Sequence, residues 1–408
     1  MSASHHFKGI GSVAIHTAQS DLPEHAHLSP IFASSTFTFD NAEQGQSRFA
    51  GSEKGYIYSR YGNPTSTVAE KVIAALEGFK VKQPDGQPLA LKALLHASGQ
   101  AASATMLFSV LSAGDSVLSH PSLYGGTHEF LYTILPQYGI NSMIQDLRDM
   151  NKLEDTIKKT PSLKLIHIET PSNPTMRCID LEAVCGLARQ YGILTSADNT
   201  FASPYLQQPF KYGVDFVFHS TTKFLNGHGS AIGGVFIGKD ESFMNGKAYK
   251  YYKMLGGNSN PFDAFLLTQG MKTLELRMER HCDNAEAVAH YLNGHSSVAK
   301  VNYNGLTDHP DYSLTCKQMR RAGSVLSFEL KDGLIAGKNF INKLNMCVRA
   351  VSVGTADTLV SHPASMSHSA VPHEDRLSFG ITDGLVRMSV GLENIEDILS
   401  DLDQALGK

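Results

Sequence analysis

Short apolar runs alternate with helical patterns from about residue 93 onward. The runs are rich in β-branched and aromatic residues, and the segments between them repeat apolar residues at helical spacing. The clearest runs before residue 220 cover 94–96, 163–169, 193–197 and 214–219. Strands that alternate with helices are typical of βαβ units, so the sequence predicts an α/β fold with a mostly parallel central sheet.

The two ends of the chain have different patterns. Residues 1–65 are rich in Pro, Ser, Thr and Gly with little helical periodicity, which predicts an N-terminal arm that contacts a neighbouring subunit. A long helical pattern covers 263–291. Strand-like runs follow it at 324–330, 347–353 and 385–392. We therefore expect the arm, a large domain over 66–260 and a smaller α+β domain over 261–408.

Polar residues follow each of the first four apolar runs. Ser98 and Gly99 follow the first run, Glu169 ends the second, and Asp198 follows the third. The fourth run leads through three hydroxyl residues to Lys223. Ligands of open α/β sheets bind at the carboxyl ends of the strands, so we place the functional site among these residues.

Composition and charge exclude several classes of protein. The formal net charge is -4, and no cluster of Lys or Arg could track a phosphate backbone, so nucleic acid is not an expected partner. No apolar stretch approaches the length of a membrane span. The five cysteines are widely spread without a Cys-x-x-Cys pair, which indicates reduced thiols, no zinc site and a cytoplasmic protein.

Lys223 is the first candidate for covalent chemistry. An amine that directly follows an apolar strand is partly desolvated, and desolvation favours the neutral form that makes Schiff bases with carbonyls. Asp198 offers a carboxylate at a neighbouring strand end, suited to a pyridinium nitrogen. Taken alone, however, such a lysine is usually solvated, and such an aspartate usually caps a turn or helix.

Two further segments could bind a phosphate. Gly99 and Gln100 offer backbone N–H groups at a helix start, and Tyr58 and Arg60 on the arm offer a phenol and a guanidinium. Taken alone, each segment also reads as an ordinary turn. The Gly9-Ile-Gly11 segment fits a dinucleotide fingerprint only formally, because no strand of useful length is predicted before it.

Three histidines near the C-terminus do not indicate a metal site. Their spacing matches no ligand pattern, and no acidic cluster accompanies them. They are His362, His368 and His373.

Taken together, seven motifs in order resemble the cystathionine and methionine metabolism family of pyridoxal-phosphate (PLP) enzymes over nearly the whole chain. The resemblance implies a fold-type I architecture, PLP as cofactor, 66–260 as its binding domain, and a homotetramer of two catalytic dimers. The motifs are Tyr58-Ser-Arg60 with Asn63-Pro-Thr65, Ser98-Gly99, Tyr124-Gly-Gly-Thr127, Glu169-Thr-Pro-Ser-Asn173-Pro174, Asp198-Asn-Thr200, Ser220-Thr-Thr222-Lys223 and Arg387-Met-Ser-Val-Gly-Leu-Glu393.

The resemblance also implies roles for single residues. Lys223 would hold PLP as a Schiff base and transfer protons, Asp198 would bind the pyridine nitrogen, and Tyr124 would stack on the ring and protonate the leaving group. Arg387 would bind the substrate carboxylate, with Asn173 and Ser352 nearby. The phosphate and ring contacts would come from Gly99, Gln100, Thr200, Ser220 and Thr222, and from Tyr58 and Arg60 of a neighbouring subunit.

Within the family, segments 49–60 and 361–369 are most similar to methionine γ-lyases. They imply γ-elimination of L-methionine to methanethiol, 2-oxobutyrate and ammonia. The alternatives are a cystathionine γ-lyase or a γ-replacement enzyme, either a cystathionine γ-synthase or an O-acetylhomoserine sulfhydrylase. A binding protein without catalysis is disfavoured, since every residue that the chemistry needs is present.

The chain departs from the methionine γ-lyase pattern in three places, one of them a pair of residues. Gly126 stands where these enzymes usually carry cysteine, Tyr252 and Lys253 replace a Lys-Asp pair, and Asp357 stands where many members have Glu. The polar segment 81–92 is longer than usual for the family and predicts an exposed loop.

Overall fold

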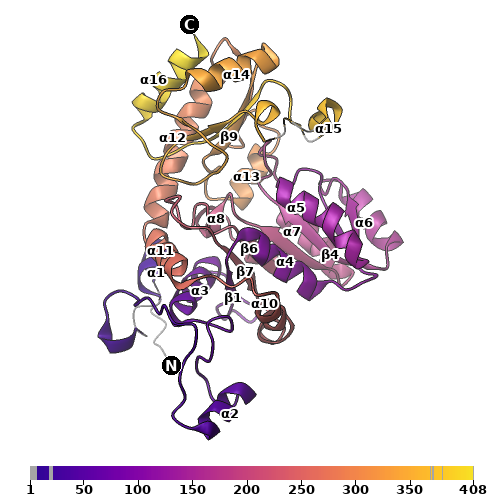
Figure 1. Ribbon diagram of the computed structural model, residues 1–408. Coiled ribbons are helices and arrows are strands. Elements are labelled where there is room, and N and C mark those ends of the chain that lie inside the picture. The colour runs from indigo at the N-terminus through magenta and orange to yellow at the C-terminus, as the bar shows by residue number, and fades with distance from the viewer. Residues whose placement is uncertain (1–6, 18–21, 368, 370–371, 379, 408) are drawn as a thin grey trace.

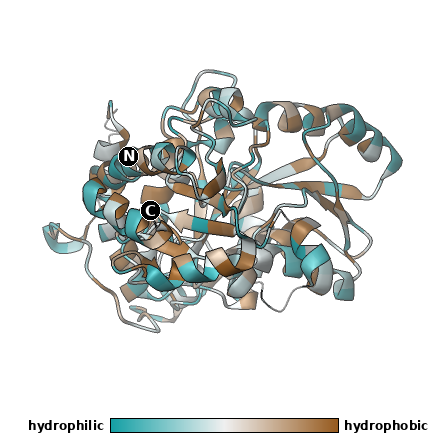
Figure 2. Ribbon diagram, turned by 90° about the horizontal axis from the view of Figure 1, so that it is seen from above, coloured by the Kyte–Doolittle hydropathy of each residue, from teal (hydrophilic) through white to brown (hydrophobic). Residues whose placement is uncertain are grey.

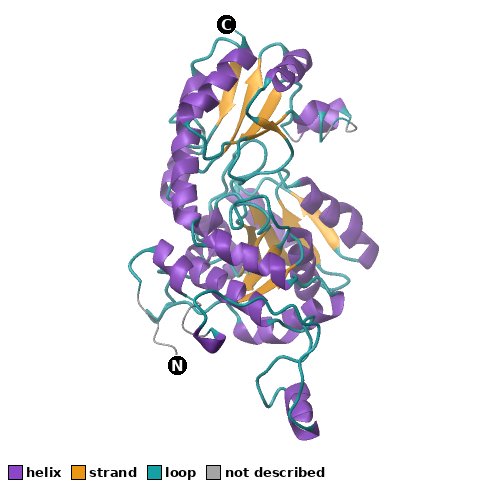
Figure 3. Ribbon diagram, turned by 60° about the vertical axis from the view of Figure 1, so that its left-hand side comes forward, coloured by secondary structure: helices purple, strands orange, loops and turns teal. Residues whose placement is uncertain are grey.

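Two sheet-centred units make up the chain, joined by a long helix (Figure 1). The computed structural model describes residues 7–17, 22–367, 369, 372–378 and 380–407. Helices flank both sheets, and the segment around helix α2 (Ala42–Ala50) stands away from the larger unit (Figure 3).

The larger unit contains a seven-stranded sheet in the order β1-β7-β6-β5-β4-β2-β3. Adjacent strands from β3 to β6 are parallel, while β7 is antiparallel to both of its neighbours. The sheet is thus mostly parallel, as the sequence predicts. Its strands are β1 (Lys92–His96), β2 (Ser116–Ser119), β3 (Asn141–Ile144), β4 (Leu163–Glu169), β5 (Leu194–Asp198), β6 (Phe216–His219) and β7 (Gly234–Gly238).

Both faces of this sheet are apolar because successive residues of a buried strand point to opposite sides. On β6, Phe216 and Phe218 pack on one face, where helix α4 lies, and Val217 packs on the other, where α3 lies. Hydrophobic residues accordingly gather on the strands, with hydrophilic residues on the outer faces of the helices (Figure 2). The pocket described below includes Gly99 and Gln100 at the start of α4.

The helices of the larger unit cover the sheet on both sides. Helix α4 begins after Ser98, whose side chain caps the N–H of Ala101. The helices are α1 (Ile10–His16), α2, α3 (Pro64–Glu77), α4 (Gly99–Val110), α5 (Gly125–Glu129), α6 (Met150–Lys159), α7 (Leu181–Gln190), α8 (Ser203–Leu206), α9 (Glu241–Phe243), α10 (Tyr249–Leu255) and α11 (Pro261–Met271). Short 3-10 or π turns are η2 (Pro23–His25), η3 (Phe130–Ile134), η4 (Leu135–Tyr138), η5 (Pro209–Tyr212) and η6 (Met244–Ala248).

The smaller unit is a five-stranded sheet in the order β10-β11-β12-β9-β8, covered by helices. Its strands are β8 (Val298–Asn302), β9 (Val325–Leu330), β10 (Val348–Arg349), β11 (Leu359–Ser361) and β12 (Leu385–Ser389). Its helical segments are α13 (Tyr312–Gln318), α14 (Gly333–Lys343), η7 (Pro363–Ser365), α15 (His373–Ser378) and α16 (Ile395–Leu406).

Helix α12 (Leu274–Asn293) joins the two units. Its first half packs into the core of the larger unit and its second half into that of the smaller one. Arg277 donates to the carbonyl of Phe224 at 2.8 Å, and His281 donates to the carbonyl of Val390 at 2.7 Å. The domain boundary at 260/261 stays a prediction, but α11 and the start of α12 pack with the larger unit.

Three sequence expectations differ from the structure. Among its described residues the arm contains helices α1, which packs on α3, and α2, which is capped by Asn41 and ended by Gly51 in a left-handed conformation (φ 75°). The pattern over 263–291 is two helices rather than one, and the run over 347–353 forms only the two-residue strand β10. Segment 81–92 is a mostly exposed loop before β1, as the sequence predicts.

The described residues contain neither a membrane-spanning helix nor a cluster of metal ligands. None of their helices is long and apolar enough to cross a membrane. They also contain no group of three or more His, Cys, Asp or Glu residues that could hold a metal ion. His362 is fully buried between Ser365 and the carbonyl of Asp383, whereas His368 lies outside the described residues.

Candidate active site

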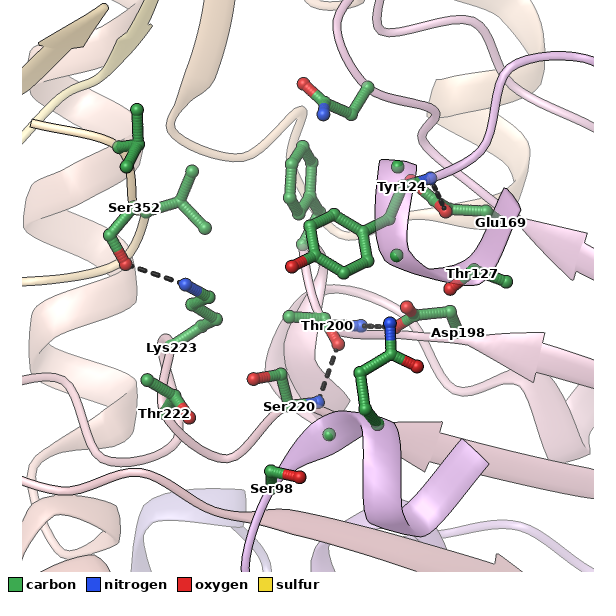
Figure 4. Close-up of a pocket in the computed structure, with 18 of the residues that line it drawn as sticks. Ser98, Tyr124, Thr127, Glu169, Asp198, Thr200, Ser220, Thr222, Lys223 and Ser352 are labelled. Atoms are coloured by element: carbon green, nitrogen blue, oxygen red, sulfur yellow. Dashed lines mark hydrogen bonds between the residues drawn. The ribbon is translucent and has the colours of Figure 1, made fainter. Parts of the chain in front are cut away.

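A pocket of about 560 Å³ opens at the carboxyl ends of β1, β4, β5 and β6. The strand ends form its floor, and residues 351–353 with Arg387 of the smaller unit form the opposite wall. Ten of its residues are labelled in Figure 4, where Lys223 and Asp198 point into the space from different sides. The sequence predicts this location correctly, because polar residues follow those four strands.

One end of the pocket is a cradle of backbone N–H groups and hydroxyls. It combines the start of α4 at Gly99 and Gln100 with Ser220 and Thr222. The Thr200 hydroxyl accepts from the Ser220 N–H at 2.9 Å and so holds this turn in place. The Thr222 hydroxyl donates to the carbonyl of Gly233 and accepts from its N–H. A helix start with adjacent hydroxyls is suited to a phosphate.

Gly99 is required by close packing in this cradle. A Cβ atom there would lie 2.9 Å from Ser220 Cβ and 3.1 Å from Ser220 Cα. Because one of these neighbours is backbone, no change of rotamer removes the clash. The start of α4 and the Ser220 turn therefore touch directly, which leaves the N–H groups of α4 facing the pocket.

Two carboxyl groups lie side by side at the ends of β4 and β5. Glu169 and Asp198 are in-register neighbours, and Asp198 accepts from the Thr200 N–H at 2.9 Å. Burial raises the pKa of Asp198, while the bonds from Thr200 and the charge of His219 lower it. Burial and the nearby Asp198 raise the pKa of Glu169 well above its usual value, against the N–H groups of Tyr124 and Asn173.

Lys223 is half-buried on the opposite side. Burial lowers its pKa below the ordinary lysine value, and the charge of Arg387 lowers it further. Its Nζ atom donates to Ser352 Oγ at 2.7 Å (Figure 4). Both influences favour the neutral amine, which is the nucleophilic form.

Tyr124 presents its ring to the pocket. Its N–H is anchored to Glu169 at 2.7 Å, but its side chain is 54% exposed. Behind the ring, Gly126 leaves room for the amide of Gln100: a Cβ at 126 would lie 2.1 Å from Gln100 Nε2 and 2.7 Å from Tyr124 Cε1. The Gln100 amide therefore occupies the space of a side chain at residue 126, the position that departs from the methionine γ-lyase pattern.

Arg387 supplies the cationic end of the pocket. Its guanidinium donates to Asn173 Oδ1 at 3.4 Å and to the carbonyl of Ser352 at 3.2 Å. Burial lowers its pKa to about 10, and the Tyr124 phenol raises it. Among the described residues no carboxylate forms an ion pair with this guanidinium. A guanidinium held in place without an acidic partner is suited to the carboxylate of a ligand.

Tyr58 and Arg60 do not line this pocket. Arg60 donates to the carbonyl of Lys253 at 2.8 Å and lies over the rings of Tyr58 and Tyr61. Their expected role in a neighbouring subunit stays a prediction. The remaining sites predicted from the sequence meet in one pocket: Gly99, Gln100, Tyr124, Asn173, Asp198, Thr200, Ser220, Thr222, Lys223, Ser352 and Arg387.

Several lining residues have no role assigned from the sequence. Glu169 is the most notable, because it anchors Tyr124 and adjoins Asp198. Its position at the end of an apolar strand is the signal that identifies it. The others are Ser98, Gly125, Gly126, Thr127, Pro171, Phe201, Phe218, Ile232, Val351, Val353 and Ser367. Tyr252, by contrast, is buried in the core against His96, and Asp357 is exposed outside the pocket.

The donor set of the pocket fits PLP. The cradle matches a phosphate, Asp198 a ring nitrogen, Tyr124 a flat ring, and Lys223 an aldehyde. The model of the family described as "Cys/Met metabolism PLP-dependent enzyme" matches residues 11–407. The chain belongs to this family. PLP is therefore its cofactor.

Its relatives include two enzymes named L-methionine gamma-lyase. That of Fusobacterium nucleatum subsp. polymorphum is 44% identical over 98% of both chains. That of Porphyromonas gingivalis is 42% identical over 98% of this chain and 97% of its own. The crystal structure of cystathionine gamma synthase from Xanthomonas oryzae pv. oryzae in complex with cystathionine is also similar, with TM-score 0.89, 36% identity and coverage of 98% and 97%.

Proposed function

We propose that this enzyme is a lyase that eliminates the γ-substituent of L-methionine. One water is consumed per turnover, and the products are methanethiol, 2-oxobutyrate and ammonia. The observation that carries the proposal is that two groups both bind Ser352. One is the Lys223 amine, whose pKa is lowered by burial and by Arg387, and the other is the Arg387 guanidinium, which has no carboxylate partner among the described residues. Methionine γ-lyases that are 42–44% identical over the whole chain support it.

The residues divide the work between binding and proton transfer. Arg387 and Asn173 hold the α-carboxylate, which brings the Cα–H bond toward Lys223. PLP, when bound, supplies an electron sink for the bonds that break at the substrate. Lys223 takes the proton from Cα and acts as acid and base in the later steps, while the Tyr124 hydroxyl gives a proton to the departing thiolate.

We further propose that each pocket is completed by a second copy of the chain within a cytoplasmic homotetramer. The supporting observation is the exposed arm: Phe49 is 66% and Tyr58 41% exposed, and Phe49 belongs to helix α2, which stands away from the body (Figure 1). The Tyr58 phenol and the Arg60 guanidinium do not line the pocket of their own chain, so they are available to the pocket of a second copy. The composition favours neither a nucleic acid nor a membrane as a partner.

A γ-replacement reaction is the second candidate. Gly126 in place of cysteine supports it, as does the similarity to a cystathionine γ-synthase structure. Elimination and replacement share the steps up to the departure of the γ-substituent, and they differ in whether water or a thiol completes the reaction.

Incubation of the holoenzyme with single substrates separates these functions. Methionine, cystathionine, cysteine, and O-acetylhomoserine with sulfide are supplied separately, and the products are identified by mass spectrometry. Methanethiol with 2-oxobutyrate from methionine is the expected result. Turnover of O-acetylhomoserine to homocysteine, with none of methionine, would contradict the lyase and establish the transferase.

A further inference from the structure

Glu77 is a buried carboxyl group behind the floor of the pocket. It ends helix α3, and its Oε1 atom accepts from His219 Nε2 at 2.6 Å and from Asn199 Nδ2 at 3.0 Å. All three residues are at most 1% exposed. His219 is the partner that the structure gives this carboxyl group in an ion pair, and no lysine or arginine of the described residues joins it. A buried carboxylate is costly unless it is paired and hydrogen-bonded, so this cluster requires an explanation.

The two partners of Glu77 adjoin the residues of the cofactor site. Asn199 directly follows Asp198, and His219 directly precedes Ser220. Asp198 pairs in register with Phe218, and both line the pocket. The next residue on each strand therefore points to the other face of the sheet, where α3 packs. One oxygen of Glu77 thus connects the ends of β5 and β6 from behind.

The same cluster extends to the substrate side of the pocket. Asn199 donates to the carbonyl of Gln207 at 2.9 Å and accepts from Gln207 Nε2 at 3.1 Å. That Nε2 atom also donates to the carbonyl of Thr170 at 2.9 Å, in the loop that leads to Asn173. Three loops that present pocket residues are therefore held by one buried hydrogen-bond network.

Charge adds a second effect to these contacts. A positive His219 lowers the pKa of Asp198, against the burial that raises it. Glu77 Oε1 already accepts from Asn199, so His219 Nε2 is assigned as the second donor to it. On the pocket side the carboxyl groups that face Asp198 include Glu169, whose negative charge would raise the pKa of Asp198 instead.

We propose that Glu77 is a positioning residue for PLP: by binding His219 and Asn199 together it fixes the ends of β5 and β6, and with them Asp198 and Ser220, relative to each other. The inference concerns the cofactor and holds for any γ-substituted amino-acid substrate. Glu77 touches neither substrate nor PLP, so its effect reaches the site through His219 and Asn199.

Replacement of Glu77 by glutamine tests the proposal because the side chain keeps its shape and loses its charge. Glu70→Gln is the matched control: Glu70 lies on the same helix and accepts from the Leu95 N–H at 2.9 Å, away from β5 and β6. The measurements are the Kd of the apo-protein for PLP, the visible absorption of the bound cofactor across pH, and the thermal midpoint of the apo-protein.

The expected result for Glu77→Gln is an increase of about tenfold in the Kd for PLP, of the size found when outer partners of a bound group are removed. The visible band should also change, because the end of β5 that carries Asp198 is no longer fixed relative to β6. Glu70→Gln should leave both properties unchanged. Glu77→Asp, which keeps the charge, should recover part of the affinity.

A Glu77→Gln protein that binds PLP with the wild-type affinity and spectrum would overturn the proposal. If the glutamine variant does not fold, His219→Gln replaces it, since that variant removes the imidazole that binds Glu77 and leaves Glu77 in place. It should show the same spectral change, and an unchanged spectrum would overturn the proposal equally.

Discussion

Lys223 and Ser352 come from different units of the molecule and meet through a hydrogen bond of 2.7 Å. Ser352 also accepts from Arg387 through its carbonyl oxygen. The amine proposed to transfer protons and the guanidinium proposed to bind the carboxylate are thus held by one residue of the loop between β10 and β11. The predictions below concern this arrangement and its surroundings.

Replacement of Arg387 by leucine should raise the pKa of Lys223 in the apo-protein. The guanidinium disfavours the ammonium form, so its removal leaves only burial to lower the pKa. The neutral amine would then appear at higher pH than in the wild type. The measurement is the rate of Schiff-base formation with pyridoxal across pH. The control Arg280→Leu removes an exposed cation outside the pocket, and an unmoved midpoint in Arg387→Leu would refute the coupling.

Replacement of Gly99 by alanine should weaken PLP binding about ten- to a hundredfold. The added Cβ would contact Ser220 at 2.9 Å, and overpacking of this kind costs roughly 1–3 kcal/mol. Titration of the apo-protein with PLP gives the affinity. Gly186→Ala is the control, because a Cβ on this residue of α7 meets nothing within 4 Å. Equal affinities for the two variants would show that the cradle does not depend on this contact.

Replacement of Gly126 by alanine should lower kcat about tenfold by displacing the Gln100 amide and the Tyr124 ring, both of which lie within 3 Å of the added atom. The loss should be smaller in a Gln100→Ala background, because one of the two obstacles is gone. A double-mutant cycle on kcat, together with the circular dichroism of the cofactor band, measures this coupling. Additive effects would mean that the two residues act independently.

Mixing an Arg60→Ala protein with a Lys223→Ala protein should restore activity. If each pocket takes Arg60 from the partner, half of the dimers in an equal mixture are mixed, and each has one complete site, so roughly a quarter of wild-type activity is expected. Turnover after subunit exchange is the measurement. Two inactive parents whose mixture stays inactive would argue that every pocket uses its own Arg60.

The sequence predicts most of the pocket because its signals are local. Asp198 and Lys223 each follow a short apolar run, and strand ends of one sheet converge, so these residues are brought together by topology alone. The order of seven motifs then assigns the cofactor. What periodicity cannot supply is the relationship between the two units, which places Ser352 and Arg387 opposite Lys223.

The remaining differences have identifiable causes. Helix α2 contains few apolar residues, so its signals are its caps, Asn41 and Gly51, rather than a periodic pattern. Glu77 contacts residues 122 and 142 positions away, and no feature of its own segment points to them. The break between α11 and α12 falls where Thr273 accepts from Arg277, a contact that a continuous apolar pattern does not reveal.

Helix α12 fixes the distance between the two units that form the pocket. Its Arg277 holds the residue after Lys223, and seven or fewer positions further its His281 and Asn284 hold the segment after Arg387. Twenty helical residues form a rod of about 30 Å whose length barely changes. The distance between Lys223 and Arg387 is therefore set by a helix that contributes no residue to the lining of the pocket.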